Sequence, residues 1–205
     1  MPYSVDIARM CVTGSDGFAC FGRYRPIRVC GMQLRTSLQH DTVRLLICRH
    51  AKSSWQDTSL SDFDRPLNKR GKRDAPEMGR RLVRQGAYPD LIMTSPAARA
   101  VATAFHYARQ LGIPPEQIRR NPAQYEASVP ELVRLIHTVD SCVGTLMLVG
   151  HNPESTDLAN ALGGLRIENI PTSGIVALTF FQCAWPDLTA GRGTLLFFDY
   201  PKKQE

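Results

Sequence analysis

The sequence contains no run of apolar residues that approaches the roughly 20 needed for a transmembrane helix, so we expect no membrane partner. Its six cysteines form no Cys-x-x-Cys pair and no His/Cys spacing typical of zinc, so we expect no metal site. Cysteine usage of this kind favours a reducing, cytoplasmic compartment. Aromatic residues do not alternate with the basic ones and no known binding module is present, which argues against a nucleic-acid partner.

Residues 1–40 lack both a sustained helical or strand period and the continuous apolar segment of a secretory signal. They contain five arginines against two acidic residues, Asp6 and Asp16. We expect this segment to be a basic, flexible N-terminal extension of a domain that spans residues 41–205. A mis-assigned start, with Met32 as the true initiator, is the alternative.

The chain carries a formal net charge of +6 over 205 residues, a length that suits one domain. A mildly basic surface and an anionic ligand both fit this charge. Eight of the basic residues lie between Arg65 and Arg84. They predict either a solvated helix face or a docking strip for an acidic partner.

Strand-like and helix-like segments alternate from Asp41 onward. Short apolar runs predict strands at 43–48, 89–94, 145–150, 173–181 and 194–200, and apolar periodicity predicts helices at 68–86, 95–112, 128–139 and 152–164. We interpret Asn68 and Ser95 as N-caps, Gly112 as a helix stop, and Ser128 with Glu131 as a capping box. The alternation predicts a three-layer α/β/α fold with a mostly parallel sheet, and the last two strands an antiparallel edge.

Polar side chains follow three of the predicted strands at their carboxyl ends. Arg49-His50, Ser95-Pro96 and His151-Asn152 stand at these positions, and ligands of open α/β sheets bind at this edge. Arg99 lies one turn into the helix that follows Ser95. Two imidazoles and two guanidiniums beside helix N-termini suit a phosphoryl group, which a neutral imidazole can attack directly. Because the arginines supply the positive charge, we expect no metal and no cofactor.

The segments "RHAKSSW", "SDFDRPLNKRGKRDAPEMGRRL", "TSPAARAVATA", "YEAS" and "VGHNP" occur in that order. Together they resemble the histidine phosphatase superfamily, the phosphoglycerate mutase-like group with an Arg-His-Gly signature. More narrowly they resemble its phosphohistidine phosphatases of the SixA type. The resemblance covers roughly residues 43–200 and implies a phosphoglycerate mutase-like fold.

The resemblance assigns roles to individual residues. It implies that His50 is the nucleophile that becomes phosphorylated, and that Arg49, Arg99 and His151 complete the phosphate pocket. Arg65 matches an arginine near the pocket mouth.

Two acidic residues compete for the role of proton donor to the leaving group. Glu126 in "YEAS" stands where many relatives carry an acid, and Asp62 in "SDFDRP" is its rival on the same edge. Asp62 and Asn152 also join the predicted substrate-binding residues.

Two departures bear on function. Ala51 replaces the glycine of the signature, and the mutase motif "RHGxSxWN" is not matched, because Gln56 also replaces its asparagine. We therefore expect a monomeric phosphatase with an open site for phosphohistidine on a protein or for small phosphomonoesters. The alternatives are a phosphotransferase or mutase, and a non-catalytic phosphate-binding adaptor; a metallophosphatase lacks the expected cluster of metal ligands.

Overall fold

The structure, a computed structural model, describes residues 42–203, so the expected N-terminal extension and Met32 lie outside the described residues. Six strands and four α-helices are present in this part of the chain. The strands are β1 (Thr42–Arg49), β2 (Leu91–Thr94), β3 (Ile118–Arg120), β4 (Thr145–Gly150), β5 (Ile175–Phe181) and β6 (Thr194–Asp199). The helices are α1 (Lys69–Arg84), α2 (Ala98–Leu111), α3 (Val129–His137) and α4 (Glu154–Gly163), with 3₁₀ turns η1 (Pro115–Gln117), η2 (Pro122–Gln124) and η3 (Trp185–Asp187).

The strands form one sheet in the order β3-β2-β4-β1-β5-β6. Strands β3, β2, β4 and β1 run parallel, whereas β5 pairs antiparallel with both β1 and β6. The predicted mixed sheet with an antiparallel edge hairpin is therefore confirmed. The three-residue strand β3 was not predicted, because so short a segment carries no readable period.

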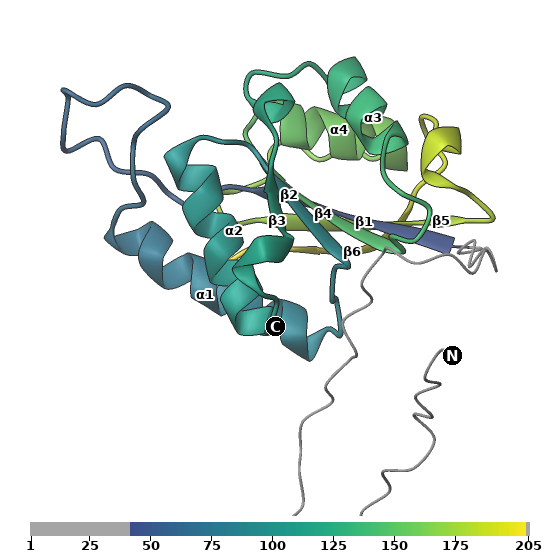
Figure 1. The fold of residues 1–205 in the computed structure, drawn as a ribbon, viewed down its shortest axis with the longest axis horizontal. Coiled ribbons are helices and arrows are strands. Elements are labelled where there is room, and N and C mark those ends of the chain that lie inside the picture. Colours follow the sequence, from purple (N-terminus) through teal and green to yellow (C-terminus); the bar gives the residue numbers. More distant parts are fainter. Residues whose placement is uncertain (1–41, 204–205) are drawn as a thin grey trace, which may run out of the picture. The chain divides into compact units, whose positions relative to one another are not determined.

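Helices α3 and α4 cover one face of the sheet and α1 and α2 the other (Figure 1). Alternate residues of β1 point to opposite faces of the sheet. Val43, Leu45 and Ile47 belong to the core under α3 and α4. Leu46 and Cys48 belong to the core under α1 and α2. All five are almost fully buried, so each aliphatic member contributes about 1.5–3 kcal/mol. This burial on both faces explains the continuous apolar run in the sequence.

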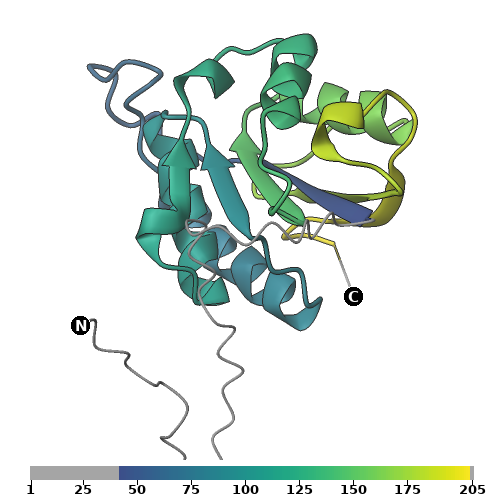
Figure 2. The ribbon, with the colours of Figure 1, turned by 45° about the vertical axis from the view of Figure 1, so that its right-hand side comes forward.

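The carboxyl ends of β1, β2 and β4 lie side by side at one edge of the sheet. The backbone N–H of His50 donates to the carbonyl of Gly150 (2.9 Å), and that of Ser95 donates to Val149 (3.0 Å). The residues after the three strands are thereby fixed next to one another. The segment between β1 and α1 projects away from this edge of the sheet (Figures 1 and 2).

Most of the predicted helix signals are confirmed, and one is wrong. The side chain of Asn68 caps α1, Gly112 ends α2 in the left-handed conformation, and Ser128 and Glu131 form the capping box of α3. Ser95, however, is not the N-cap of α2. The helix begins at Ala98 after Ala97, and the Ser95 hydroxyl instead contacts His151.

Part of the positive charge between Arg65 and Arg84 is balanced by carboxylates within the protein. Each of the six arginines in this range pairs with a carboxylate: Arg65 with Asp62, Arg70 and Arg73 with Asp74, Arg80, Arg81 and Arg84 with Glu77, and Arg81 also with Asp199. Because eight basic residues share four carboxylates, an excess of positive charge remains, which fits both a charged helix face and a docking strip. Among residues 42–203 no helix is long and apolar enough to cross a membrane.

The close approach of α1 to the segment after His50 depends on Gly71. A Cβ at this position would overlap the carbonyl oxygen of Lys52, which accepts a hydrogen bond from the backbone of Asn68. We therefore expect Gly71→Ala to lower the free energy of unfolding by about 1–3 kcal/mol, as in other overpacked sites. Urea unfolding measures the change.

Gly79→Ala on the same helix is the matched control. Its Cβ would meet the Cγ and Cβ of Gln110 at 2.8 and 2.9 Å, a milder overlap than that with the Lys52 oxygen, so we expect a smaller loss. Equal losses in the two variants would contradict the role given to Gly71.

Candidate active site

Two histidines from neighbouring parallel strands face each other at the carboxyl edge of the sheet. His50 directly follows β1 and His151 directly follows β4, and their ring centroids lie 5.1 Å apart. The sequence-based prediction that the ends of these strands meet is thus realised in the geometry.

The hydrogen bonds of His50 define its tautomer. Its Nδ1 lies 2.8 Å from the carbonyl oxygen of Ala51, which can only accept, so Nδ1 carries the proton. Nε2 is left with a lone pair, toward which the Nε–H of Arg99 donates at 3.3 Å. Burial, together with the charges of His151, Arg99 and Arg49, lowers the pKa of His50 to about 3, although the Ala51 bond opposes the shift. His50 is therefore a neutral imidazole with a nucleophilic nitrogen at pH 7.

His151 has the opposite tautomer. An Arg99 nitrogen, Nη2, lies 3.2 Å from its Nδ1 and can only donate, so Nε2–H donates to the hydroxyl of Ser95 at 2.7 Å. Burial and the charges of Arg99 and Arg49 lower the pKa of His151 to about 4, against the opposing charge of Asp62. Ser95 thus orients His151. The sequence did not reveal this role, because a serine followed by proline also fits a helix N-cap.

Arg99 connects all parts of the site. It is only 5% exposed and lies in the first turn of α2. Besides both histidines, it donates to the backbone carbonyl of Asp62 and, at 2.8 Å, to the carboxylate of Asp62. Thr103 attaches the helix to the residue after His50, because its hydroxyl accepts from the Ala51 N–H and donates to the Arg99 carbonyl.

Arg49 directly precedes His50 and is held by the loop before β5. Its Nη1 donates to the side chain of Asn169 (3.1 Å) and to the carbonyl of Ile170 (2.7 Å). The side-chain amide of Asn152 donates to the same two oxygens. Asn152 and Asn169 therefore orient Arg49. Asn169 was missed by the sequence analysis, since an isolated asparagine in a loop carries no signal.

Arg65 and Asp62 extend the site toward the projecting segment. Arg65 forms an ion pair with Asp62 at 2.6 Å, and its guanidinium carbon lies 3.4 Å from the ring centroid of Trp55. Asp62 thus bridges Arg65 and Arg99. Burial alone would raise the pKa of Asp62, but these two arginines outweigh it and hold the pKa below its usual value.

Glu126 does not share in this network. It is exposed, with a positive φ of 56°, and follows Tyr125, whose ring lies 5.7 Å from that of His151. The structure therefore brings together His50, His151, Arg49, Arg99, Arg65, Asp62 and Asn152, and leaves Glu126 at the rim.

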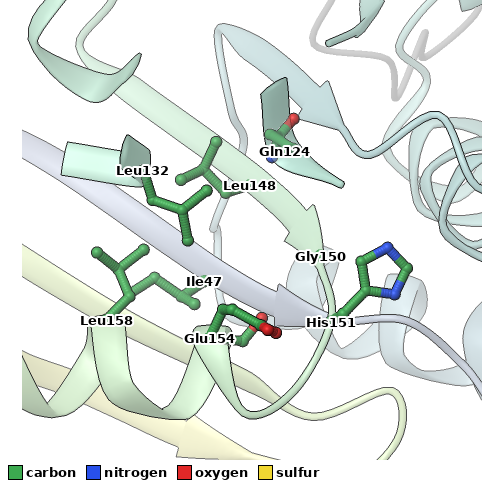
Figure 3. A pocket seen from close by; sticks show the side chains of 9 residues that line it. Ile47, Gln124, Leu132, Leu148, Gly150, His151, Glu154 and Leu158 are labelled. Carbon is green, nitrogen blue, oxygen red and sulfur yellow. The ribbon is translucent and has the colours of Figure 1, made fainter. Parts of the chain in front are cut away.

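A small cavity lies behind His151, between β1, β4 and α4 (Figure 3). Gln124 and Glu154 line it together with apolar side chains, and its volume of about 10 Å³ is the space of a single water molecule. A phosphoryl group cannot fit there.

Several guanidinium N–H groups of the site are buried without a partner among the described residues, namely Nε of Arg49 and, beyond Asp62, both Nε and Nη1 of Arg65. Buried donors are normally satisfied, so these groups fit an anionic ligand with several acceptor oxygens. The site combines a neutral nitrogen nucleophile with three arginines and one carboxylate. That combination can bind a tetrahedral oxyanion and attack its central atom.

Comparisons with known proteins agree with this geometry. The sequence model described as Histidine phosphatase superfamily (branch 1) matches residues 45–120. An uncharacterised chloroplast protein of Arabidopsis thaliana is 31% identical over 73% of this chain and 72% of its own, and an uncharacterised Mycobacterium tuberculosis protein is 34% identical over 75% and 99%. The crystal structure of a candidate phosphohistidine phosphatase, SixA, from Agrobacterium tumefaciens superposes with a TM-score of 0.67 at 30% identity, over 78% of this chain and 98% of that one.

The lowered pKa values of the two histidines predict acid sensitivity of the fold. Both lie below the ordinary value of 6.5, so between about pH 4 and 6.5 the unfolded chain binds more protons than the folded one. Stability is therefore full above pH 6.5 and falls as the pH drops through this range. Each histidine contributes a slope of up to about 1.4 kcal/mol per pH unit.

We expect the double variant His50→Gln/His151→Gln to lose much less stability between pH 7.5 and pH 5 than the wild type. Urea unfolding at both pH values measures this difference. Asn152→Ala, which removes a side chain of the site that does not titrate, should keep the wild-type slope. A wild-type slope in the double variant would show that neither histidine is held neutral.

Proposed function

Because the chain belongs to branch 1 of the histidine phosphatase superfamily, we propose that it is a phosphatase that acts through a covalent phosphohistidine on His50. The observation that carries this proposal is the pair of contacts from Arg99. The buried guanidinium of Arg99 donates to the unprotonated nitrogen of His50 and to His151, so a positive charge lies directly beside the nucleophile.

In the first step, Nε2 of His50 attacks phosphorus, a nitrogen–phosphorus bond forms and the bond to the leaving group breaks. The Nδ1–H bond to Ala51 orients the ring and stabilises the positive charge that develops on it. Arg49, Arg99 and Arg65 offset the negative charge of the phosphoryl oxygens. In the second step water attacks the phosphohistidine and returns His50 and inorganic phosphate. The three guanidiniums supply the charge that a metal ion supplies in other phosphatases, so we propose that no metal takes part.

We propose Glu126 as the proton donor to the leaving group. Asp62 is poorly suited to this role in the free protein, because its arginine partners hold it ionised. Glu126 stands at the rim, beside Tyr125 and away from the arginine pair. A carboxyl group there can reach a leaving group that points out of the site.

Phosphohistidine on a protein is the substrate class we propose, with small phosphomonoesters as the second. The similarity to a candidate SixA phosphohistidine phosphatase supports the first. Exposed Trp55 and Phe63, 68% and 37% accessible, lie on the projecting segment, where they can contact a macromolecule. We also propose a cytoplasmic monomer. Transfer to an acceptor other than water would identify a phosphotransferase or mutase, and phosphate binding without turnover an adaptor.

We expect His50→Ala to reduce turnover of 4-nitrophenyl phosphate and of a phosphohistidine protein by roughly 10³-fold or more, because the variant lacks the nitrogen, Nε2, that attacks phosphorus. EDTA should leave wild-type turnover unchanged. Steady-state hydrolysis measures both effects, and acid-labile labelling from a ³²P substrate detects the intermediate.

His106→Gln, a histidine change on α2 outside the site, is the control and should retain activity. Full activity in His50→Ala, or its loss in EDTA, contradicts the mechanism.

The role of Glu126 as proton donor is tested by how the rate of hydrolysis depends on the leaving group. We expect Glu126→Gln to slow hydrolysis of an alkyl phosphate by about 10²-fold while it changes 4-nitrophenyl phosphate little, since a nitrophenolate leaves without protonation. Glu168→Gln, an acidic change on the loop before β5, serves as the control. Equal effects on both substrates would remove Glu126 from this role.

A further inference from the structure

We propose that Asp62 is a built-in anion that occupies the arginines of the phosphate pocket between turnovers, so that a phosphoryl group must displace it in order to bind. The proposal rests on the proposed function for the identity of the entering anion. It concerns the same site and assigns Asp62 a positioning role.

The contacts of Asp62 imitate those of a bound oxyanion. One carboxylate oxygen lies 2.8 Å from Nη2 of Arg99, and the other lies 2.6 Å from Nη2 of Arg65. Two guanidiniums that share the oxygens of one anion form the arrangement expected around a phosphoryl group. The carboxylate belongs to the segment that projects from the sheet edge, and half of its side-chain surface is exposed. It therefore has room to leave.

A phosphoryl group cannot share Arg99 with Asp62 in this position. Phosphoryl oxygens on Nη2 of Arg99 would stand beside the carboxylate, and like charges at such distances repel strongly in a partly buried site. The cavity behind His151 offers no other space, since it admits only about one water molecule. The carboxylate must therefore turn away when the anion enters.

The same contact keeps Arg99 against the nucleophile. While Asp62 holds Nη2, the Nε–H of Arg99 donates to the lone pair of His50 that must attack phosphorus. Exchange of the carboxylate for a phosphoryl group gives Nη2 of Arg99 a new acceptor, and a second phosphoryl oxygen that accepts from Nε–H releases the lone pair of His50. When no substrate is bound, Asp62 thus keeps the two arginines in place. When substrate enters, Asp62 competes with the phosphoryl group for the same arginines.

The test is anion affinity in Asp62→Asn, which keeps the shape of the side chain and removes its charge. We expect inorganic phosphate and tungstate, titrated by calorimetry, to bind about ten-fold more tightly, a modest factor because a half-exposed ion pair contributes little. The inhibition constant of phosphate and the KM should fall in parallel, whereas a merely structural change would not tighten binding.

Asp64→Asn is the matched control, because it removes the same charge two residues along the segment. Asp64 bonds to the Ser61 hydroxyl and has no ion pair with an arginine among the described residues, so its variant should bind phosphate like the wild type. Equal tightening in both variants would show a long-range charge effect and overturn the proposal. Unchanged or weaker binding in Asp62→Asn would overturn it as well.

Two further measurements distinguish a wrong role for Asp62 from a misfolded variant and from a wrong proposed function. Asp62→Ala must agree in direction with Asp62→Asn, and thermal melting of each variant establishes that it is folded. Anion binding requires no turnover, so inactivity of the wild type would contradict the proposed function while the titrations still decide the role of Asp62.

Discussion

The burial of the Arg99 guanidinium is the constraint on which the site depends. A cation that is 5% exposed requires partners on several sides, and it finds two imidazole nitrogens, one carbonyl and one carboxylate. The imidazoles can serve only as neutral acceptors, since a protonated ring would place like charges in contact. Burial is the main cause of the lowered pKa of both histidines and the charge of Arg99 adds to it, so both rings stay neutral and His50 keeps the lone pair that makes it a nucleophile.

The sheet makes this arrangement possible before any side chain is considered. Because β1 and β4 are parallel neighbours in register, with Arg49 opposite Gly150, their following residues must lie side by side. Strand β2 adds Ser95 at the same edge and starts the connection that places Arg99 in the first turn of α2. Three short connections thus deliver four side chains to one point, with little loop entropy to overcome.

The sequence predicted the parts of the site that follow directly from strand ends and helix starts. His50, His151 and Arg99 belong to this group, since apolar runs locate the strands and their order sets the edge. The remaining contacts were not predictable, because they join residues that are distant in sequence and irregular in backbone. Asn169 reaches Arg49 from a loop, and Asp62 reaches Arg99 from the projecting segment. Ser95 was misinterpreted because its local sequence fits a helix cap as well as it fits a partner for His151.

The charges of the site explain why it selects strongly anionic groups. Within residues 42–203, Arg49 and Arg65 keep buried donors without partners, whereas Arg99 donates to neutral nitrogens and to Asp62. One carboxylate therefore balances only part of the charge of three guanidiniums. A ligand of charge −2 with three free oxygens can satisfy more of these donors than the carboxylate can. Burial, and after it the charges of Arg99 and Arg49, disfavours protonation of His50, so the positive charge that attracts the phosphoryl group also helps to keep the nucleophile unprotonated.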